Sequence, residues 1–201
     1  MAHYYKKPKQ KNQTLTHEYI RNQLEGQEGE TFIKDFIALA KKHPPKKYEY
    51  YLKHEVYIKK RRRRMDTVIF LHVCSGKTLT IGIEIKGHRR NLIWDNKLFE
   101  YLGHTDFFFL AVPTALIKPA RLKASQDPHI GIIRMRDGKI IVFPERQDVP
   151  QEYRDEVYKK YFSAKKNNLN QHAFSICEGS HAISLSHLSQ VSQPSHLSKL
   201  S

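Results

Sequence analysis

The sequence predicts an α/β domain in which a mixed β-sheet is flanked by helices. Three observations favour this class: an amphipathic helical stretch precedes the first strand, turn residues join two apolar runs, and a helical stretch separates two other apolar runs. The chain of 201 residues is long enough for one domain with its own core. We expect this single domain at 15–162, between a flexible basic arm at 1–14 and a low-complexity, disordered tail rich in Ser and His at 163–201.

The domain begins with residues 16–42, which have the apolar spacing of a helix. Gly26 and Gly29 can divide this stretch into two helices, and two prolines end it. A strand follows at 48–59, because tyrosine, valine and isoleucine alternate with charged residues there. The helical stripe that faces the core is expected to consist of Phe32, Ile33, Phe36, Ile37 and Ala40.

Two hairpins are predicted from pairs of apolar runs that flank turn residues. The first pairs 67–74 with 79–85, around a Ser-Gly-Lys turn. The second pairs 130–134 with 139–143, around an Arg-Asp-Gly turn. A final helix is expected at 150–162, so that helices stand at both ends of the domain.

A βαβ unit is predicted between these hairpins. Residues 91–103 have an apolar helical face, in which Trp94 is interpreted as a core anchor. The continuous apolar run at 107–112 is typical of a strand buried on both faces. A helix between the strands at 79–85 and 107–112 makes them parallel, with a right-handed crossover.

The charge balance indicates a polyanionic partner. The chain carries 35 Lys and Arg against 20 Asp and Glu, which gives a net charge of +15. This excess is clustered, because residues 41–64 hold eleven basic side chains and only two acidic ones. Clustered charge favours a protein that binds nucleic acid over one whose basic charge only keeps it in solution. No apolar run reaches membrane-spanning length and no secretory signal is recognisable, so we expect a cytoplasmic protein without a membrane role.

Three polar residues are expected to meet at one edge of the first hairpin. Asp66 precedes the strand at 67–74, and Glu84 and Lys86 stand at the end of the strand at 79–85. In an antiparallel hairpin the start of one strand lies beside the end of the next. Side chains two apart on a strand point to the same face, so Glu84 and Lys86 share a side. The alternative interpretation is an ordinary ion pair at a solvated strand end.

This combination of two carboxylates and one amine suits phosphodiester hydrolysis. Two close carboxylates repel each other, and a divalent cation removes that conflict. Mg²⁺ fits a site with few carboxylates and substrate phosphate oxygens, and Mn²⁺ is expected to substitute for it. Asp66 and Glu84 are therefore predicted to bind metal, and Lys86 to position or activate the attacking water.

A third carboxylate is expected from the first core helix. Glu28 and Glu30 both qualify by position, and Glu30 is preferred because Ile33 and Ile37 follow it at helical spacing. Either glutamate could instead interact only with the helix dipole.

The stretch from Arg63 to Pro113 resembles the MmcB-like DNA-repair proteins, a branch of the PD-(D/E)xK nuclease superfamily. The resemblance rests on three motifs, and it covers about a quarter of the chain strongly. Arg89, Asp95, Lys97, Tyr101 and Asp106 also fall at matching positions. The three motifs are Arg63-Arg64-Met65-Asp66-Thr67-Val68, Glu84-Ile85-Lys86, and Phe107-Phe108-Phe109-Leu110-Ala111-Val112-Pro113.

The resemblance implies a restriction-endonuclease-like fold, a nuclease site and a role in DNA repair. Members of the superfamily are often dimers, so a homodimer is an expectation that no patch in the sequence requires. The alternatives are a non-catalytic DNA-binding module on the same fold and an RNA-binding protein without a hydrolase site. His88 and Asn91 depart from the family pattern, although neither belongs to the three catalytic residues.

Further residues are expected around the catalytic group. A set of arginines is predicted to hold the DNA backbone. A second set on the helix at 91–103 is predicted to support the site, although a surface ion pair explains Asp95 and Lys97 equally well. The backbone-binding set is Arg61, Arg62, Arg63, Arg64, Arg89 and Arg90, and the supporting set is Asp95, Lys97 and Tyr101.

Overall fold

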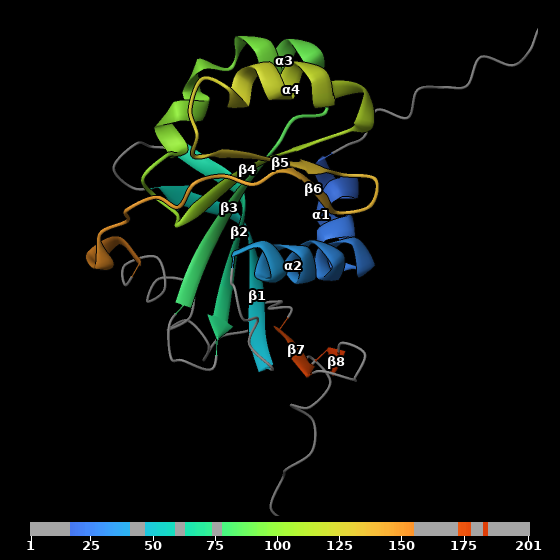
Figure 1. The fold of residues 1–201 in the computed structure, drawn as a ribbon, viewed down its shortest axis with the longest axis vertical. Helices are drawn as coiled ribbons and strands as arrows, with labels where there is room; N and C mark the ends of the chain where they lie inside the picture. Colours follow the sequence, from blue (N-terminus) through green and yellow to red (C-terminus); the bar gives the residue numbers. More distant parts are fainter. Residues whose placement is uncertain are drawn as a thin grey trace, which may run out of the picture.

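The computed structural model describes residues 17–40, 47–58, 63–73, 78–154, 173–177 and 183–184. Its strands form one mixed sheet in the order β6-β5-β4-β3-β2-β1-β7-β8, and helices cover both faces (Figure 1). The predicted α/β class, a mixed sheet flanked by helices, is therefore confirmed. The basic arm predicted at 1–14 lies outside the described residues.

The first helical stretch is divided into two helices, as its glycines predict. Helix α1 (His17–Glu25) and helix α2 (Gln27–Ala40) are separated by Gly26. The helices approach closely at Gly29, where a Cβ atom would lie 1.9 Å from the main-chain oxygen of Leu24. The buried residues of α2 include Phe32, Ile33, Phe36 and Ile37, which are four of the five predicted for its stripe.

The first three strands form an antiparallel meander. β1 (Lys47–Ile58) pairs with β2 (Arg63–Val73), and β2 pairs with β3 (Thr78–Ile85). The predicted hairpin is thus confirmed, but β2 begins earlier than the predicted 67. Asp66 therefore lies within a strand, so the alternation of side chains along β2 determines the face to which its carboxylate points.

The remaining strands confirm the βαβ unit and the second hairpin. β4 (Phe107–Val112) is parallel to β3, and β5 (Ile130–Arg134) is parallel to β4. β6 (Lys139–Val142) returns antiparallel to β5. Gly138 has a φ of 68° in the turn between them, a conformation that glycine adopts without steric cost.

The helix predicted at 91–103 is instead two short segments. α3 (Arg89–Trp94) is followed by the 3₁₀ helix η2 (Asn96–Tyr101), and Asp95 separates them. Its carboxylate accepts a hydrogen bond from the main-chain N–H of Lys97 at 3.0 Å, which caps η2 and ends α3. Trp94, the last residue of α3, is 75% exposed rather than a core anchor.

One helix was not expected from the sequence. The 3₁₀ turn η3 (Thr114–Leu116) leads into α4 (Ile117–Ala124). Pro119 stands in the first turn of α4, where no intrahelical partner exists for a main-chain N–H, so the helix tolerates it. Of the final helix predicted at 150–162, residues 151–154 are helical, and 155–162 lie outside the described residues.

Two short strands occur in the stretch for which the sequence predicts no order. β7 (Ala173–Cys177) pairs antiparallel with β1, and β8 (Ile183–Ser184) pairs with β7. The open edge of β1 provides unpaired main-chain groups for this addition, a contribution that composition does not reveal. The other residues of 163–201 lie outside the described residues.

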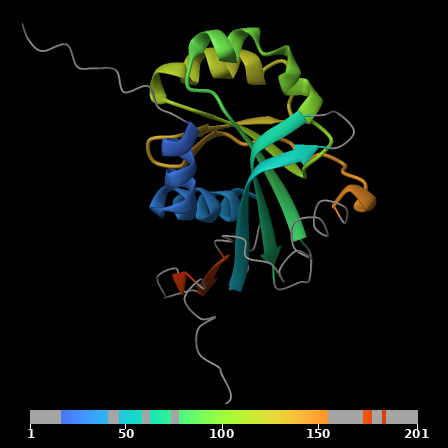
Figure 2. The ribbon, with the colours of Figure 1, turned by 180° about the vertical axis from the view of Figure 1, so that it is seen from behind.

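The core has two layers, one on each face of the sheet (Figures 1 and 2). One layer packs Leu24 of α1 and the stripe of α2 against alternate residues of the central strands. The other packs α3, η2 and α4 against the opposite face of the same strands. No helix that the structure describes combines the length and the apolar character needed to cross a bilayer.

Candidate active site

The three residues predicted to carry chemistry lie on the same face of the sheet. Ile81, Ile83 and Ile85 of β3 belong to the core layer under α1 and α2. Because side chains alternate along a strand, Glu84 and Lys86 point to the α3–α4 face. Val68 of β2 packs in the core layer on that face, so Asp66 points there too.

Asp66 stands where the strands of the hairpin separate. The last paired residues at this end of the hairpin are Thr67 and Ile83, and Asp66 precedes Thr67 in β2, opposite Glu84. Its Oδ2 accepts a hydrogen bond from the main-chain N–H of Ile85 at 2.8 Å. The carboxylate is buried. This bond fixes its position beside the end of β3.

Lys86 joins two carboxylates. Its Nζ lies 2.8 Å from Glu84 Oε1 and 2.6 Å from Asp95 Oδ2, and the side chain is buried. Its main-chain N–H donates to the carbonyl of Ala111 in β4 at 3.0 Å, so the residue still belongs to the ordered end of the sheet. The ammonium group is therefore held by partners on β3 and on the α3–η2 junction.

Burial and charge together change the ionisation of Glu84. Burial, followed by the nearby charge of Asp66, raises the pKa of this carboxyl from 4.5 to about 7, although Lys86 opposes both effects. Its Oε2 is buried and has no hydrogen-bond partner among the described residues. An unpartnered buried carboxylate oxygen is costly unless a cation or a proton binds it.

A magnesium ion is compatible with this donor set. Asp66 and Glu84 supply carboxylate oxygens, and Mg²⁺ usually takes only one or two carboxylates together with waters and phosphate oxygens. In the part of the chain that the structure describes, no three His, Cys, Asp or Glu side chains form a ready-made metal site. The unpartnered oxygen of Glu84 is the observation that favours a cation here.

The ammonium form of Lys86 is stabilised in this cluster. Burial lowers the pKa of the amine, but the charges of Glu84 and Asp95 and their hydrogen bonds outweigh it and raise the pKa to about 12. Lys86 therefore carries a positive charge at neutral pH. Such a group can donate hydrogen bonds and stabilise negative charge, but it holds its proton too tightly to remove one from water.

We expect Glu84→Gln to stabilise the metal-free protein at pH 8 by roughly 1–3 kcal/mol. A carboxyl whose pKa is raised on folding, here from 4.5 to about 7, contributes stability below pH 4.5 and loses that contribution as the pH rises through about 7. Glutamine has no proton to lose. Urea unfolding in EDTA should show near-equal stability at pH 4.5 and a gain for the variant at pH 8; equal stability at both would contradict the prediction.

The structure distinguishes among the residues predicted to support the site. Asp95 is in direct contact with Lys86, as given above. Tyr101 is buried, and the pKa of its hydroxyl is raised to about 12 by burial and by the charge of Glu84, which places it beside the cluster. Its hydroxyl donates to the main-chain oxygen of Arg64 at 3.3 Å. Lys97 contributes the main-chain N–H that Asp95 caps, and its side chain is exposed.

The structure does not bring Glu30 to the cluster. Its Oε2 lies 3.7 Å from Lys34 Nζ on the same helix. Its charge, after burial, raises the pKa of Tyr48 to about 12, and that ring packs in the core layer under α2. Glu28 is on the same helix, which covers the opposite face of the sheet, and its main chain adjoins Gly138 in the β5–β6 turn. The third carboxylate near Lys86 is Asp95.

A polar chain on the α1 side of the sheet was missed. The imidazole of His54 in β1 lies 2.8 Å from Glu25 Oε1 through Nε2 and 2.8 Å from Thr67 Oγ1 through Nδ1. Thr67 directly follows Asp66, so this chain ties α1 to the strand segment that carries the site. Sequence alone gave no signal for it, because the three residues come from separate elements.

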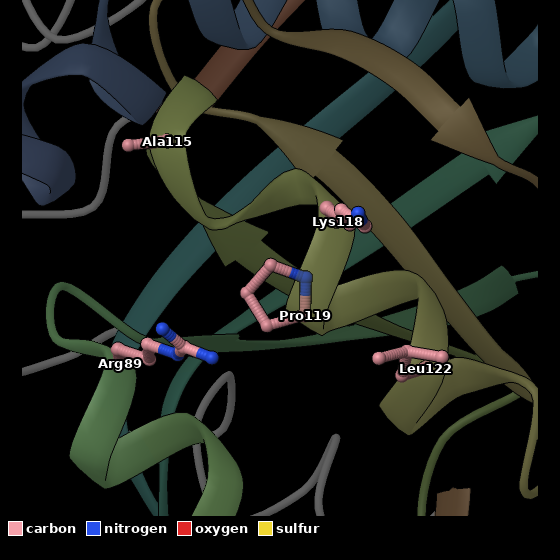
Figure 3. A pocket seen from close by; sticks show the side chains of 5 residues that line it. All are labelled: Arg89, Ala115, Lys118, Pro119 and Leu122. Carbon is pink, nitrogen blue, oxygen red and sulfur yellow. The ribbon is translucent and has the colours of Figure 1, made fainter.

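The arginines have different environments. Arg64 is exposed and forms an ion pair with Glu55, which stands at a β1 position with a φ of 56°. Arg61 and Arg62 lie outside the described residues, and only the main chain of Arg63 is described. Arg89 and Arg90 are exposed at the start of α3. Arg89 also lines a pocket against α4 (Figure 3).

Comparisons with known proteins add little to this geometry. No family model matches the sequence, and no curated protein matches it. Among solved structures, the chain is similar to a protein of unknown function from Silicibacter pomeroyi, with 19% identity and a TM-score of 0.46. That match covers 58% of this chain and 75% of the other.

Proposed function

We propose that this chain is a metal-dependent deoxyribonuclease that hydrolyses DNA phosphodiester bonds in repair. The observation that carries the proposal is the buried group of Asp66, Glu84 and Lys86 on one sheet face, with Glu84 Oε2 unpartnered. The net charge of +15 supports a polyanionic substrate. The resemblance of 63–113 to MmcB-like proteins supports DNA repair as the setting.

In this proposal Asp66 and Glu84 hold Mg²⁺, and Mn²⁺ can replace it. The bound ion supplies positive charge to phosphate oxygens and lowers the pKa of water. Asp66 is positioned by the N–H of Ile85, and Glu84 by its bond to Lys86. The ionised form of Glu84 is needed for this role, so metal affinity should increase as the pH rises toward about 7.

Lys86 is proposed to orient the attacking water and to stabilise charge on the phosphate. A raised pKa of about 12 favours this function over proton removal. Asp95 is a positioning residue in the proposal, because it holds the ammonium group from the α3–η2 junction at 2.6 Å. Arg89, Arg90 and the arginines at 61–64 are proposed to bind the flanking phosphates.

We expect Lys86→Ala to reduce Mg²⁺-dependent cleavage by about 10²–10³-fold, the range for losing one group that stabilises transition-state charge. The test is nicking of supercoiled plasmid, followed by a panel of nicked, flapped, branched and single-stranded DNA, with Mg²⁺, Mn²⁺ or EDTA. Lys34→Ala on α2 is the matched control, because Lys34 is an exposed lysine that pairs with Glu30 away from the cluster.

A competing function is a non-catalytic nucleic-acid-binding module, for DNA or RNA. It is favoured by the two carboxylates that already neutralise Lys86, because such an ion cluster can be purely structural. Absent cleavage with both metals, together with retained binding of nucleic acid, would support this alternative, and equal cleavage by wild type and Lys86→Ala would remove Lys86 from the proposed site. Competition between duplex DNA and structured RNA would then identify the ligand.

A further inference from the structure

Large apolar side chains are exposed on α3, η2 and α4, which cover the same face of the sheet. Trp94 is 75% exposed and Leu122 is 67% exposed. Ile93 and Phe99 are exposed to a smaller extent, and the ammonium of Lys123 lies 5.3 Å from the centre of the Phe99 ring. We call this area the α3–α4 surface. An indole this exposed is unusual on a protein surface and marks a candidate binding site.

A basic pocket lies within the same surface. Its volume is about 360 Å³. Figure 3 shows Arg89 extending from the start of α3 toward η3 and α4, which carry the other lining side chains. Neither helix contains an acidic residue, whereas α3 and α4 together carry five Arg and Lys. The pocket is lined by Arg89, Ala115, Lys118, Pro119 and Leu122.

The α3–α4 surface adjoins the candidate active site. Trp94 is the last residue of α3, and the next residue, Asp95, contacts Lys86 Nζ at 2.6 Å. Both the catalytic group and α4 lie on the same face of the sheet. The surface and the cluster are therefore linked through adjacent residues on one face of the sheet.

We infer that the α3–α4 surface binds an unpaired stretch of DNA, in which a base stacks on Trp94 and phosphates contact Arg89 and Lys118. Positive charge on two helices that contain no acidic residue, α3 and α4, favours a polyanion over an apolar protein partner. An aromatic face beside cations is the arrangement that binds single strands, because duplex bases are already stacked and paired. As a preference of the cleavage site, this inference rests on the proposed function.

The chain offers a direct reporter, because Trp94 is its only tryptophan. Titration of the full chain with oligo(dT) in EDTA should quench tryptophan fluorescence, since a stacked base lies against the indole. Trp94→Ala should weaken binding about tenfold or more, measured by anisotropy of labelled oligo(dT), and Trp94→Phe should restore most of the affinity. Leu39→Ala is the control, because Leu39 is an exposed apolar residue of α2.

The cationic part has its own measurement. For single strands, log affinity falls with log salt with a slope of roughly −0.7 for each neutralised phosphate. Arg89→Ala combined with Lys118→Ala should therefore reduce the slope by about 1.4. Lys34→Ala should leave it unchanged, because Lys34 lies on α2. An unchanged slope in the double variant would refute phosphate contacts in the pocket.

The outcomes separate this inference from the proposed function, because binding is measured without metal. Unquenched fluorescence at saturation, or a Trp94→Ala affinity for oligo(dT) equal to that of wild type, refutes DNA binding at the α3–α4 surface. This holds even if the chain cleaves DNA. Quenched binding in a chain that never cleaves supports the surface and refutes hydrolysis. Tighter binding of duplex DNA or oligo(rU) than of oligo(dT) refutes unpaired DNA as the ligand. A concentration-dependent doubling of mass with a blue-shifted emission shows a second copy covering Trp94, and also overturns it.

Discussion

Asp66→Asn should abolish Mg²⁺ binding and reduce cleavage by roughly 10³-fold or more, while the chain remains folded. The amide oxygen of asparagine can still accept the hydrogen bond from Ile85 N–H that now holds the carboxylate at 2.8 Å. The local geometry is therefore preserved, and only the charge is lost. Calorimetric titration with Mg²⁺ or Mn²⁺ and the plasmid assay measure the two effects.

The same variant has a second, independent readout. The charge of Asp66 is one of the causes, after burial, of the raised pKa of Glu84. Removing this charge should lower the pKa of Glu84, as followed by NMR titration of labelled carboxyl groups. Asp35→Asn, on α2, is the control. An unchanged Glu84 pKa would mean that the two carboxylates do not share one site, and retained Mg²⁺ affinity would remove Asp66 from the proposed metal ligands.

Phe36→Ala should destabilise the protein by about 3–5 kcal/mol, the usual cost of removing a large buried aromatic side chain. Phe36 is fully buried and contacts four other rings. Its ring centroid lies 4.9 Å from that of Phe107 and 5.5 Å from that of Phe143, which join α2 to the sheet. The substitution removes these contacts and leaves a cavity that rigid neighbours cannot fill.

Urea unfolding followed by circular dichroism measures this loss. Leu39→Ala is the matched control, because Leu39 lies on the same helix but is 58% exposed, and its removal should cost less than about 1 kcal/mol. A loss below about 1 kcal/mol for Phe36→Ala would show that α2 is not a central part of the core. An equally large loss for Leu39→Ala would mean that another element covers the exposed side of α2.

The placement of Asp66, Glu84 and Lys86 together was predictable because it depends on local rules. A turn between two apolar runs determines an antiparallel hairpin, and the alternation of side chains places Glu84 and Lys86 on one face. The approach of Asp66 follows from the same pairing. The 2.8 Å between Lys86 Nζ and Glu84 Oε1 agrees with that prediction. Residues of one hairpin come together without any contact between distant parts of the sequence.

Glu30 lies away from the cluster to which it was predicted to belong, because its position depends on packing between elements. Helical periodicity placed Glu30 on the sheet side of α2 but could not identify which face of the sheet α2 covers. In the structure α2 covers the face opposite the cluster. Asp95 reaches Lys86 instead, because it breaks the helix predicted at 91–103 and lies at the junction of α3 and η2.

Sequence by itself determined the α/β class, the two hairpins, the parallel strands and the meeting of Asp66, Glu84 and Lys86. These features follow from hydrophobic period and turn chemistry, which act over a few residues. Only the tertiary structure decided the exposure of Trp94, the contact of Asp95 with Lys86, the distance of Glu30 from the cluster and the added strands β7 and β8. Each of these depends on which surfaces meet, and a one-dimensional pattern contains the preference for burial but not the identity of the partner.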